Sequence, residues 1–420
     1  MAKTVFIIVD GMADLPIKML NNKTPLEYAY KPNITLLLKN AAYAYPSVLG
    51  KLAPQSDAGV MADLGYDPIK YSTGRGWFEC VGLGMKPTDG DLSIRVNFGE
   101  VNNGKLSSVR VYMSKEELKD LEDEINSKVR IPAEFDFKSG EGYRAGLVIR
   151  KGKVPLSAYV SNNEPGYTAK FYPNGKKLSF ASGFKDTTIK PVKAMRREGA
   201  ATARLLNTFI KEASRVIKES KVYRNRVKNK QQLPNFLFIR DAAVRDPRLP
   251  DINETSGKKW CAVAGMPLEK GIAESVGMEL VDLSEYPSLN EDLTRKADAA
   301  VSVLKSFDCV YIHIKQTDSA SHLGKYTDKY AIIEVIDRIL ISRLSKVISV
   351  DKGDTLVMTC DHATSSELKR HIDSNIPVLI VNKRFGRSND FGETACRKNH
   401  LKQIRKATDI IPFMTKLWRY

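Results

Sequence analysis

Residues 5–10 of the chain read VFIIVD, a run of five apolar side chains that ends in a carboxylate. Similar runs stand at 235–241 (NFLFIRD), 309–315 (CVYIHIK), 354–361 (DTLVMTCD) and 376–382 (IPVLIVN). Their apolar residues follow one another without alternation, which is typical of strands buried on both faces of a parallel sheet. Because ligands of open α/β sheets bind beyond the carboxyl ends of the strands, the polar residues that end most of these runs are expected to form the site.

Helical patterns separate the apolar runs. They cover residues 56–65, 268–277, 293–307 and 326–350, the last with apolar residues at the three- and four-residue spacing of a buried helix face. Strand and helix therefore alternate. This alternation predicts an α/β protein with a doubly wound, mostly parallel sheet.

The middle of the chain follows another pattern. Between residues 72 and 231 the apolar stretches are shorter and alternate with polar residues, and two helices are expected, at 115–128 and 198–219. This pattern predicts an α+β domain, residues 72–231, inserted into a catalytic domain made of residues 1–71 and 232–420.

The composition is that of a folded globular protein. Of 420 residues, 42% are hydrophobic and 27% are charged, and the longest apolar runs are far shorter than the ~20 residues of a membrane span. The N-terminus lacks the apolar segment of about 7 to 15 residues that marks an export signal, and the five scattered cysteines form no CxxC pair. A reducing, cytoplasmic location is therefore expected.

The chain is basic, with 66 lysines and arginines against 49 acidic residues. Its net charge of +17 attracts anions, either nucleic acid or small phosphates. Residues 183–230 carry fourteen basic and four acidic side chains, and much of this stretch is predicted to be one helix. A solvated basic face explains such a helix equally well.

Three histidines stand beside acids or just after predicted strands. In TDSASHLG, Asp318 and His322 are four residues apart, so both side chains lie on one face of a helical turn. Such a pair either grips a divalent cation or forms a surface ion pair. Asp361 and His362 end the stretch DTLVMTCDH, and His371 follows nine residues later. Since the chain has only five histidines, the clustering favours a metal site.

Two metal ions about 3.5 to 4 Å apart form a clamp for phosphoryl transfer and need roughly six or seven ligands. Six residues of suitable type are Asp10, Asp318, His322, Asp361, His362 and His371. Taken alone, Asp10 is as well explained by a capping role in the turn at Gly11. The seventh ligand is expected from the nucleophile.

Ser56 directly precedes the helical pattern in PQSDAGVMADLGYDP. A serine in this place is usually a helix N-cap. The same position suits a phosphorylated nucleophile, because unpaired N–H groups and the helix dipole favour an anion there. A metal on the serine oxygen would lower the pKa of the hydroxyl, so no neighbouring base is required.

Seven motifs occur in a characteristic order: VDGMAD, TPLEYAYKPN, PQSDAGVMADLGYDP, GRGWFEC, IKQTDSASHLG, TCDHAT and RHIDSNIPVLI. Together they resemble the archaeal-type cofactor-independent phosphoglycerate mutase family, part of the alkaline phosphatase superfamily. The resemblance runs from about residue 4 to residue 418. It implies an alkaline-phosphatase-like fold and the interconversion of 3-phosphoglycerate and 2-phosphoglycerate, in glycolysis and gluconeogenesis, without added 2,3-bisphosphoglycerate.

The resemblance also implies roles for single residues. The family's nucleophile falls on Ser56, which would form a phosphoserine. One divalent metal ion, manganese, zinc, cobalt or magnesium, would be held by Asp318, His322 and His371. The other would be held by Asp10, Ser56, Asp361 and His362.

A mutase must return the phosphoryl group to the same glycerate, so the inserted domain is expected to hold the substrate and exclude water. Arginine forks suit the carboxylate and phosphate groups of this substrate. The candidates are Arg75, Arg95, Arg144, Arg196, Arg197 and Arg240, with Arg75 and Arg240 placed first.

Two alternatives stay open. A metal-dependent phosphomonoesterase or other phosphohydrolase of the same superfamily would use the same metals and serine, because fold does not fix function. A nucleic-acid-binding protein would explain the net charge. However, the sequence contains no aromatic-rich ribonucleoprotein motif, finger spacing or helix-turn-helix signature, so nucleic acid is not the expected partner.

Overall fold

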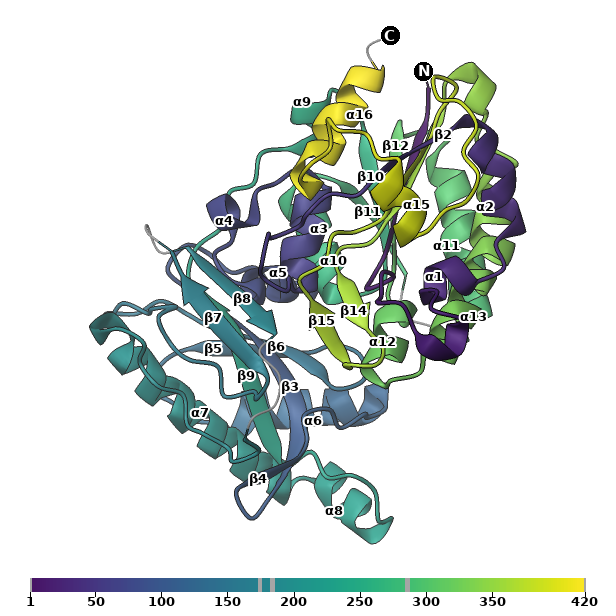
Figure 1. The fold of residues 1–420 in the computed structure, drawn as a ribbon. Coiled ribbons are helices and arrows are strands. Elements are labelled where there is room, and N and C mark those ends of the chain that lie inside the picture. Colours follow the sequence, from purple (N-terminus) through teal and green to yellow (C-terminus); the bar gives the residue numbers. More distant parts are fainter. Residues whose placement is uncertain (1, 173–175, 182–185, 284–287, 419–420) are drawn as a thin grey trace. The chain divides into compact units, whose positions relative to one another are not determined.

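The computed structural model describes residues 2–172, 176–181, 186–283 and 288–418 (Figure 1). The chain divides into two compact units. Unit 1 consists of Met1–Lys70 and Leu249–Tyr420, and unit 2 of Tyr71–Arg248. The inserted domain predicted at residues 72–231 lies within unit 2.

A mostly parallel sheet forms the centre of unit 1. In the described part of the chain its strands lie in the order β11-β10-β12-β1-β13-β16-β2, and β16 runs antiparallel to both neighbours. The strands are β1 (Thr4–Val9), β2 (Ala41–Ala44), β10 (Trp260–Ala264), β11 (Glu279–Asp282), β12 (Cys309–Ile314), β13 (Thr355–Thr359) and β16 (Val378–Val381). The predicted α/β class with a mostly parallel sheet is confirmed.

Helices cover this sheet on both faces, with α3, α10 and α16 on one side and α2, α11 and α13 on the other (Figure 1). The helices of unit 1 are α1 (Pro25–Tyr28), α2 (Pro32–Leu37), α3 (Ser56–Asp63), α4 (Pro68–Tyr71), α9 (Ile252–Ser256), α10 (Pro267–Ser275), α11 (Leu289–Val303), α12 (Gln316–His322), α13 (Tyr326–Ile336), α14 (Ser342–Leu344), α15 (Glu393–Lys398) and α16 (Ile410–Trp418). A short hairpin, β14 (Ala363–Ser365) and β15 (Arg370–Ile372), follows β13.

The helix predicted over residues 326–350 is not a single regular helix. A π-helical turn, Asp337–Ile341, joins α13 to α14. The carboxylate of Asp337 is buried and accepts hydrogen bonds from the backbone N–H groups of Asn33 (3.0 Å) and Ile34 (2.7 Å). It therefore caps the start of α2 from a neighbouring helix, a long-range contact that periodicity does not reveal.

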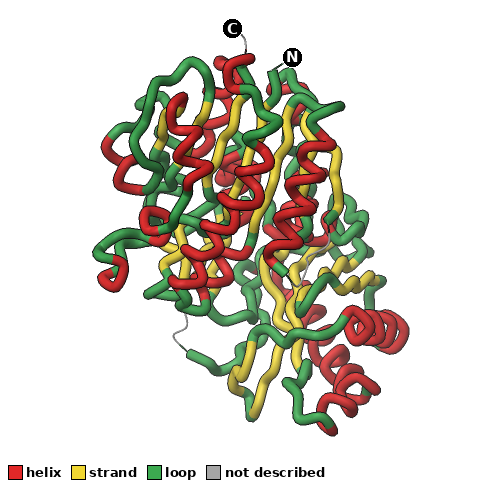
Figure 2. Tube along the Cα trace, turned by 90° about the vertical axis from the view of Figure 1, so that its right-hand side faces the viewer, coloured by secondary structure: helices red, strands yellow, loops and turns green. Residues whose placement is uncertain are grey.

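Unit 2 has the predicted α+β organisation. Its antiparallel sheet has the order β4-β3-β6-β5, with β9 also paired to β3, and β7 pairs with β8 separately. The strands are β3 (Leu92–Asn102), β4 (Lys105–Ser108), β5 (Phe135–Ser139), β6 (Arg144–Ile149), β7 (Tyr167–Phe171), β8 (Lys177–Ala181) and β9 (Phe236–Ala243). The helices are α5 (Arg75–Gly82), α6 (Lys115–Lys128), α7 (Ala200–Glu219) and α8 (Lys221–Lys228). Figure 2 shows the strands and helices of each unit from the side.

The apolar run at 235–241 was expected in the parallel sheet, and this placement is wrong. The run forms β9, which pairs antiparallel with β3 in unit 2, Phe98 opposite Leu237. Nearly all of β9 is buried, because helices α5 and α7 both pack against it. An antiparallel strand covered on both faces has the same continuous apolar pattern as a strand of a parallel sheet.

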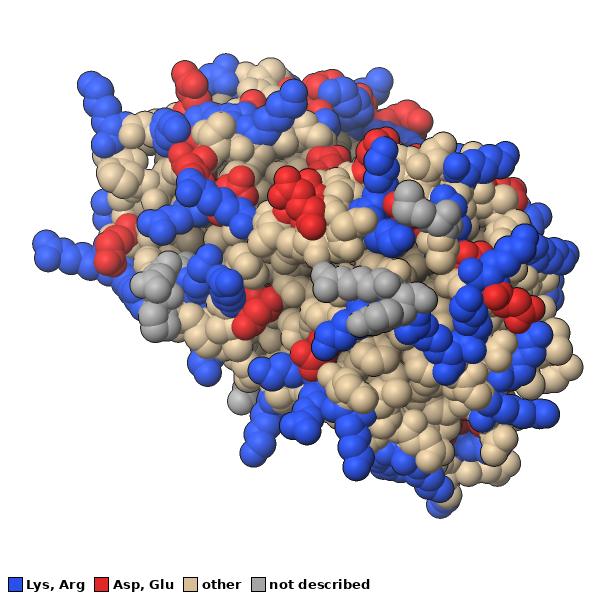
Figure 3. All heavy atoms as spheres, turned by 90° about the horizontal axis from the view of Figure 1, so that it is seen from above, with Lys and Arg blue, Asp and Glu red and all other residues tan. Residues whose placement is uncertain are grey.

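The basic stretch at 183–230 contains α7 and α8, which follow a segment without α-helix at residues 186–199. Residues 183–185 lie outside the described residues. In α7, Leu206, Phe209 and Ala213 are buried, whereas Arg204 and Lys211 are exposed. The helix therefore has the solvated basic face of the simpler interpretation. On the face of the molecule shown in Figure 3, Lys and Arg side chains are scattered among Asp and Glu rather than gathered in one patch.

Within the described ranges, no helix is both long and apolar enough to span a membrane.

Candidate functional site

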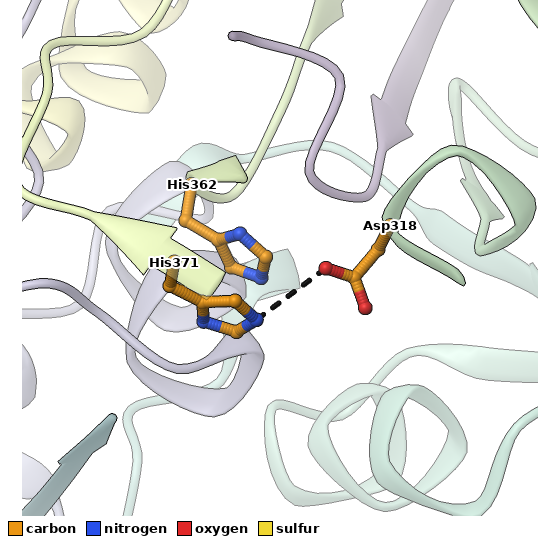
Figure 4. Close-up of side chains that lie close together, drawn as sticks. All are labelled: Asp318, His362 and His371. Carbon is orange, nitrogen blue, oxygen red and sulfur yellow. Dashed lines mark ion pairs between the residues drawn. The ribbon is translucent and has the colours of Figure 1, made fainter. Parts of the chain in front are cut away.

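The predicted acidic and histidine residues of unit 1 come together beyond the carboxyl ends of its central strands. Asp10 follows β1, Asp318 lies in α12 after β12, and Asp361 and His362 follow β13. Two overlapping groups have ligand atoms within 4.8 Å of one another: Asp318, His362 and His371, and Asp10, Asp361 and His362. All of these residues are buried. Figure 4 shows His362 and His371 side by side with Asp318 facing them.

His322 joins the first of these groups. Its Nε2 lies 3.4 Å from Oδ1 of Asp318, and Nε2 of His371 lies 3.4 Å from the same oxygen. Asp318 is only 5% exposed. The pair at 318 and 322 is therefore not a surface ion pair.

Two glycines permit the close packing around the site. Gly11 has φ +61°, and a Cβ there would lie 2.6 Å from Oγ1 of Thr364. A Cβ at Gly59 would lie 2.1 Å from the carbonyl oxygen of Asp361. The absence of a side chain at Gly59 thus lets α3 lie directly against the end of β13.

Ser56 is the first residue of α3, and the N-cap position is taken by Gln55, whose side chain makes no capping hydrogen bond. The serine is buried at 2% exposure, so its hydroxyl does not face bulk solvent. Its Oγ lies 3.3 Å from Nε2 of His362 and 3.5 Å from Nζ of Lys315. The usual reading of such a serine as an N-cap therefore does not apply here.

The hydrogen bonds of His322 and His371 leave their Nε2 lone pairs directed at Asp318. Nδ1–H of His371 donates to the carbonyl oxygen of Pro54 (2.7 Å), and Nδ1–H of His322 donates to that of Lys369 (3.1 Å). Metal-binding histidines are generally fixed in this way by a hydrogen bond from the other ring nitrogen.

His362 has the same tautomer through a different contact. Oγ1 of Thr364 donates its proton to Asp318 (2.9 Å), so it accepts one from Nδ1–H of His362 (3.0 Å). Nε2 of His362 then carries a lone pair 3.3 Å from Oδ1 of Asp10. Burial, followed by the proximity of His371, lowers the pKa of His362 to about 4, which keeps the ring neutral. Two acceptor atoms this close, with no proton between them, suit a bound cation.

The carboxylates of the site carry more charge than their neighbours neutralise. Among the described residues, Oδ1 of Asp10 and Oδ2 of Asp361 have no hydrogen-bond partner. Burial disfavours charge on Asp10, but Lys315 and the hydrogen-bonding neighbours of this carboxyl together outweigh it and hold its pKa well below the ordinary value. Burial and the charge of Asp10 raise the pKa of Asp361 well above its ordinary value. The donor set therefore fits divalent cations.

Three residues near the site were missed in the sequence. Lys315 forms ion pairs with Asp10 and Asp318, and it could have been noticed as a cation at a strand end in IKQTDSASHLG. His313 and Glu269 face Asp10 from β12 and from α10. The sequence around His313 and Glu269 does not indicate that they lie next to Asp10, because both residues fall inside patterns typical of a buried strand or helix.

Four of the six arginine candidates lie in one buried region of unit 2. Arg75 and Arg95 donate to the same oxygen of Glu79, at 2.8 and 2.9 Å, and Arg95 lies opposite Arg240 on neighbouring strands. The pKa of Glu79 responds to Arg144 as well as to Arg75 and Arg95, so Arg144 belongs to the same region. We call this region the arginine cluster.

The arginine cluster contains further polar residues. Arg240 lies 3.3 Å from Glu164 and 3.7 Å from the ring of Tyr167. Arg110, which sequence reasoning missed, lies 5.4 Å from the ring of Tyr143. Burial raises the pKa of Tyr143, but Arg144 and then Arg110 outweigh it and lower that pKa to about 8.

Five arginines of the cluster thus face three carboxylates, those of Glu79, Glu164 and Asp241. In the described part of unit 2, Nε of Arg95 and Nη1 of Arg240 are buried without a hydrogen-bond partner. Spare guanidinium donors of this kind fit an anionic ligand. The other two candidates are exposed: Arg196 stacks over Tyr159, and Arg197 lies in a short 3-10 turn.

Comparisons with known proteins point to one family. Residues 44–223 match the family model described as 2,3-bisphosphoglycerate-independent phosphoglycerate mutase. Proteins of this name from Pyrococcus furiosus and Metallosphaera sedula are 34% and 32% identical to the chain, over 99% and 95% of it and 97% and 94% of their own lengths.

Two solved structures are similar to this chain over nearly its whole length. A protein of Pyrococcus horikoshii matches with a TM-score of 0.78 at 26% identity, over 100% of this chain and 97% of its own. A cofactor-independent phosphoglycerate mutase from Thermoplasma acidophilum matches with a TM-score of 0.61 at 26% identity, over 99% and 100%.

Proposed function

The chain belongs to the 2,3-bisphosphoglycerate-independent phosphoglycerate mutase family, and from this premise we propose that it interconverts 3-phosphoglycerate and 2-phosphoglycerate through a phosphoserine at Ser56. Such an enzyme is an isomerase and acts in glycolysis and gluconeogenesis. The observation that carries the proposal is the position of Ser56, buried at the start of α3 with Lys315 and His362 within 3.5 Å of its Oγ.

The proposed metal ligands are the residues expected from the sequence. One ion would be held by Asp318, His322 and His371, and the other by Asp10, Ser56, Asp361 and His362. The inward Nε2 atoms and the unpartnered carboxylate oxygens support this assignment. When bound, two divalent ions polarise phosphoryl oxygens and lower the pKa of a coordinated hydroxyl. Among the ions that such ligands accept, we propose manganese.

The remaining residues of unit 1 would act on the phosphoryl group. The first N–H groups of α3 have no partner within the helix, and they favour negative charge next to Ser56. Lys315 adds a cation at the same place. Burial disfavours this charge, but Asp10 and Asp318 outweigh it and raise the pKa of Lys315, so it stays protonated at neutral pH.

The arginine cluster of unit 2 would bind the glycerate. A phosphoserine enzyme returns its phosphate to a second hydroxyl only if the acceptor stays bound and water is excluded. The spare donors of Arg95 and Arg240 suit the carboxylate of this acceptor. The family relationship supports this mutase over a plain phosphomonoesterase, which could dispense with such a site.

Mass spectrometry tests the nucleophile. After a rapid quench with 3-phosphoglycerate, we expect phosphate on the wild-type peptide that contains Ser56. Ser56→Ala should remove both this label and the turnover, whereas Ser302→Ala, at an exposed position in α11, should change neither. A label on another residue, or mutase turnover by Ser56→Ala, would show that the assignment is wrong.

We also propose a cytoplasmic location. All five cysteines, Cys80, Cys261, Cys309, Cys360 and Cys396, are buried free thiols, as is usual for proteins of a reducing compartment.

A further inference from the structure

His313 differs from the three histidines proposed as metal ligands in the direction of its proton. Nδ1 of His313 lies 2.9 Å from the hydroxyl of Tyr311. Nε2 of the same ring faces carboxylate oxygens of Asp10 and Glu269, which only accept hydrogen bonds, so the hydroxyl of Tyr311 is left to donate to Nδ1. The ring therefore carries its own proton on Nε2, and this N–H points to the site.

Two carboxylates share this single donor. Nε2 of His313 lies 3.2 Å from Oδ2 of Asp10 and 3.3 Å from Oε1 of Glu269. The side chains of all three residues are at most 2% exposed. Because the three side chains are almost fully buried, the geometry of these groups depends on their contacts with one another.

We propose that His313, held by Tyr311 and Glu269, is a positioning residue that orients Asp10 for metal binding. The contact from His313 and the ion pair from Lys315 both occupy Oδ2 of Asp10. This leaves Oδ1 as the oxygen without a hydrogen-bond partner, on the side of His362. A carboxylate with one oxygen fixed cannot rotate, so its other oxygen stays aimed at the cation.

Asp10, Glu269 and His313 also have ligand atoms close enough to one another to hold a metal ion of their own. The tautomer argues against it. A metal would need the lone pair of Nε2, and that atom carries the proton while Tyr311 occupies Nδ1. The unpartnered Oε2 of Glu269 is then explained as the free oxygen of a carboxylate whose other oxygen meets His313.

Titration with Mn²⁺ by calorimetry tests the inference, which rests on the proposed metal site. His313→Leu removes the donor, whereas His313→Gln keeps an N–H near the position of Nε2. We expect His313→Leu to weaken Mn²⁺ binding by about 10- to 100-fold, as the loss of such a partner does, and His313→Gln to stay within about 3-fold of wild type. Tyr311→Phe should cause a smaller loss in the same direction. All variants should bind as many ions at saturation as wild type.

The same variants should separate turnover from substrate binding. A misaligned Asp10 lowers kcat with little change in KM, and His313→Gln should restore kcat. Cys309→Ala, which removes a buried side chain from the same strand without touching the site, controls for loss of packing in β12. Equal losses in His313→Leu and His313→Gln would reduce His313 to a packing residue, and one ion fewer in His313→Leu would make it a ligand.

Long-range ¹H–¹⁵N correlations in the metal-free protein give an independent reading. We expect the proton on Nε2 in His313 and on Nδ1 in His322, His362 and His371. A proton on Nδ1 of His313 would overturn the inference whatever the metal data show. If wild type bound no Mn²⁺, the proposed metal site would be wrong, whereas tight binding that His313→Leu leaves unchanged would refute only the positioning role.

Discussion

The two units contain buried polar clusters of opposite charge. In unit 1, the carboxylates of Asp10, Glu269, Asp318 and Asp361 surround one lysine, Lys315. In unit 2, five arginines surround three carboxylates. A buried excess of one charge costs stability unless something neutralises it. The contrast indicates that each cluster is shaped for a ligand of the other sign, cations in unit 1 and an anion in unit 2.

The largest effect is expected when the cation ligands of unit 1 are removed. Chelation, Asp361→Ala or His322→Ala should each reduce mutase turnover by several orders of magnitude, because such ions supply several kcal/mol of transition-state stabilisation. His400→Ala is a matched control, since His400 is exposed and hydrogen-bonded only to the backbone of Arg397 among the described residues. Full activity of the chelated enzyme would contradict the assignment of unit 1 as a cation site.

Weakening the anion site of unit 2 should alter the outcome of the reaction as well as its rate. Arg240→Ala or Arg75→Ala is expected to lose at least ~100-fold in mutase turnover, about 2.7 kcal/mol, while the ratio of free phosphate to isomerised product rises. The reason is that phosphate can still load onto Ser56, but a loosely held glycerate leaves and water replaces it.

Arg197→Ala is the control for the ratio of free phosphate to isomerised product. Arg197 is exposed and makes no contact with the arginine cluster among the described residues. Both products are measured together by separating free phosphate from 2-phosphoglycerate after a single time course. If Arg240→Ala and Arg75→Ala lost isomerisation and hydrolysis in equal proportion, unit 2 would not be what retains the glycerate.

A smaller effect is expected from the packing that supports the unit 1 cluster. In Gly59→Ala the new methyl group would meet the backbone oxygen of Asp361, which cannot move like a side chain. The substitution should destabilise the protein by about 1 to 3 kcal/mol and displace Ser56 from the strand end. Gly386→Ala has open space around its Cβ and should be neutral. Urea denaturation of both variants, with turnover measured in parallel, decides whether Gly59 is needed for the close contact of α3 with the end of β13.

The residues of the unit 1 cluster that sequence predicted share one property, their position at the end of an apolar run or in a motif of adjacent polar residues. Asp10, Asp361 and His362 satisfy it directly, since the parallel sheet was recognisable and its carboxyl edge is a known place for ligands. Glu269 and His313 do not. Their role depends on which face of α10 meets which position of β12, and a single sequence contains no record of that packing.

In unit 2, the sequence indicated suitable residue types but did not indicate which of them lie together. The arginines could be named as candidates, but six were named and the structure gathers only four of them. Arg110 was missed because nothing in its local sequence marks it. The strand β9 was assigned to the wrong sheet because continuous burial, not strand direction, produces its pattern. Local patterns thus predict what forms a strand, and pairing partners decide which cluster its side chains join.

The smallest predicted effect concerns the pH dependence of the arginine cluster. Burial raises the pKa of Glu79, but Arg95 and then Arg75 outweigh it and lower the pKa from 4.5 to about 2. An acid with a depressed pKa in the folded state contributes stability above its unfolded pKa and loses that contribution as pH falls towards the folded value. The loss for Glu79 therefore falls between about pH 5 and pH 2. By about pH 4 it should amount to about 1 kcal/mol relative to pH 6.5.

Glu79→Gln isolates this contribution. The variant should be less stable than wild type at neutral pH, because Arg75 and Arg95 lose their shared carboxylate, but the difference should shrink as the solution is acidified. Glu134→Gln, at an exposed position of the same unit, should keep the wild-type profile. The measurement is the free energy of unfolding by urea at several pH values. A gap between wild type and Glu79→Gln that stays constant from neutral pH down to about pH 3 would mean that Glu79 does not anchor the arginines as a carboxylate, and the cationic excess assigned to unit 2 would then be larger than five arginines against three acids.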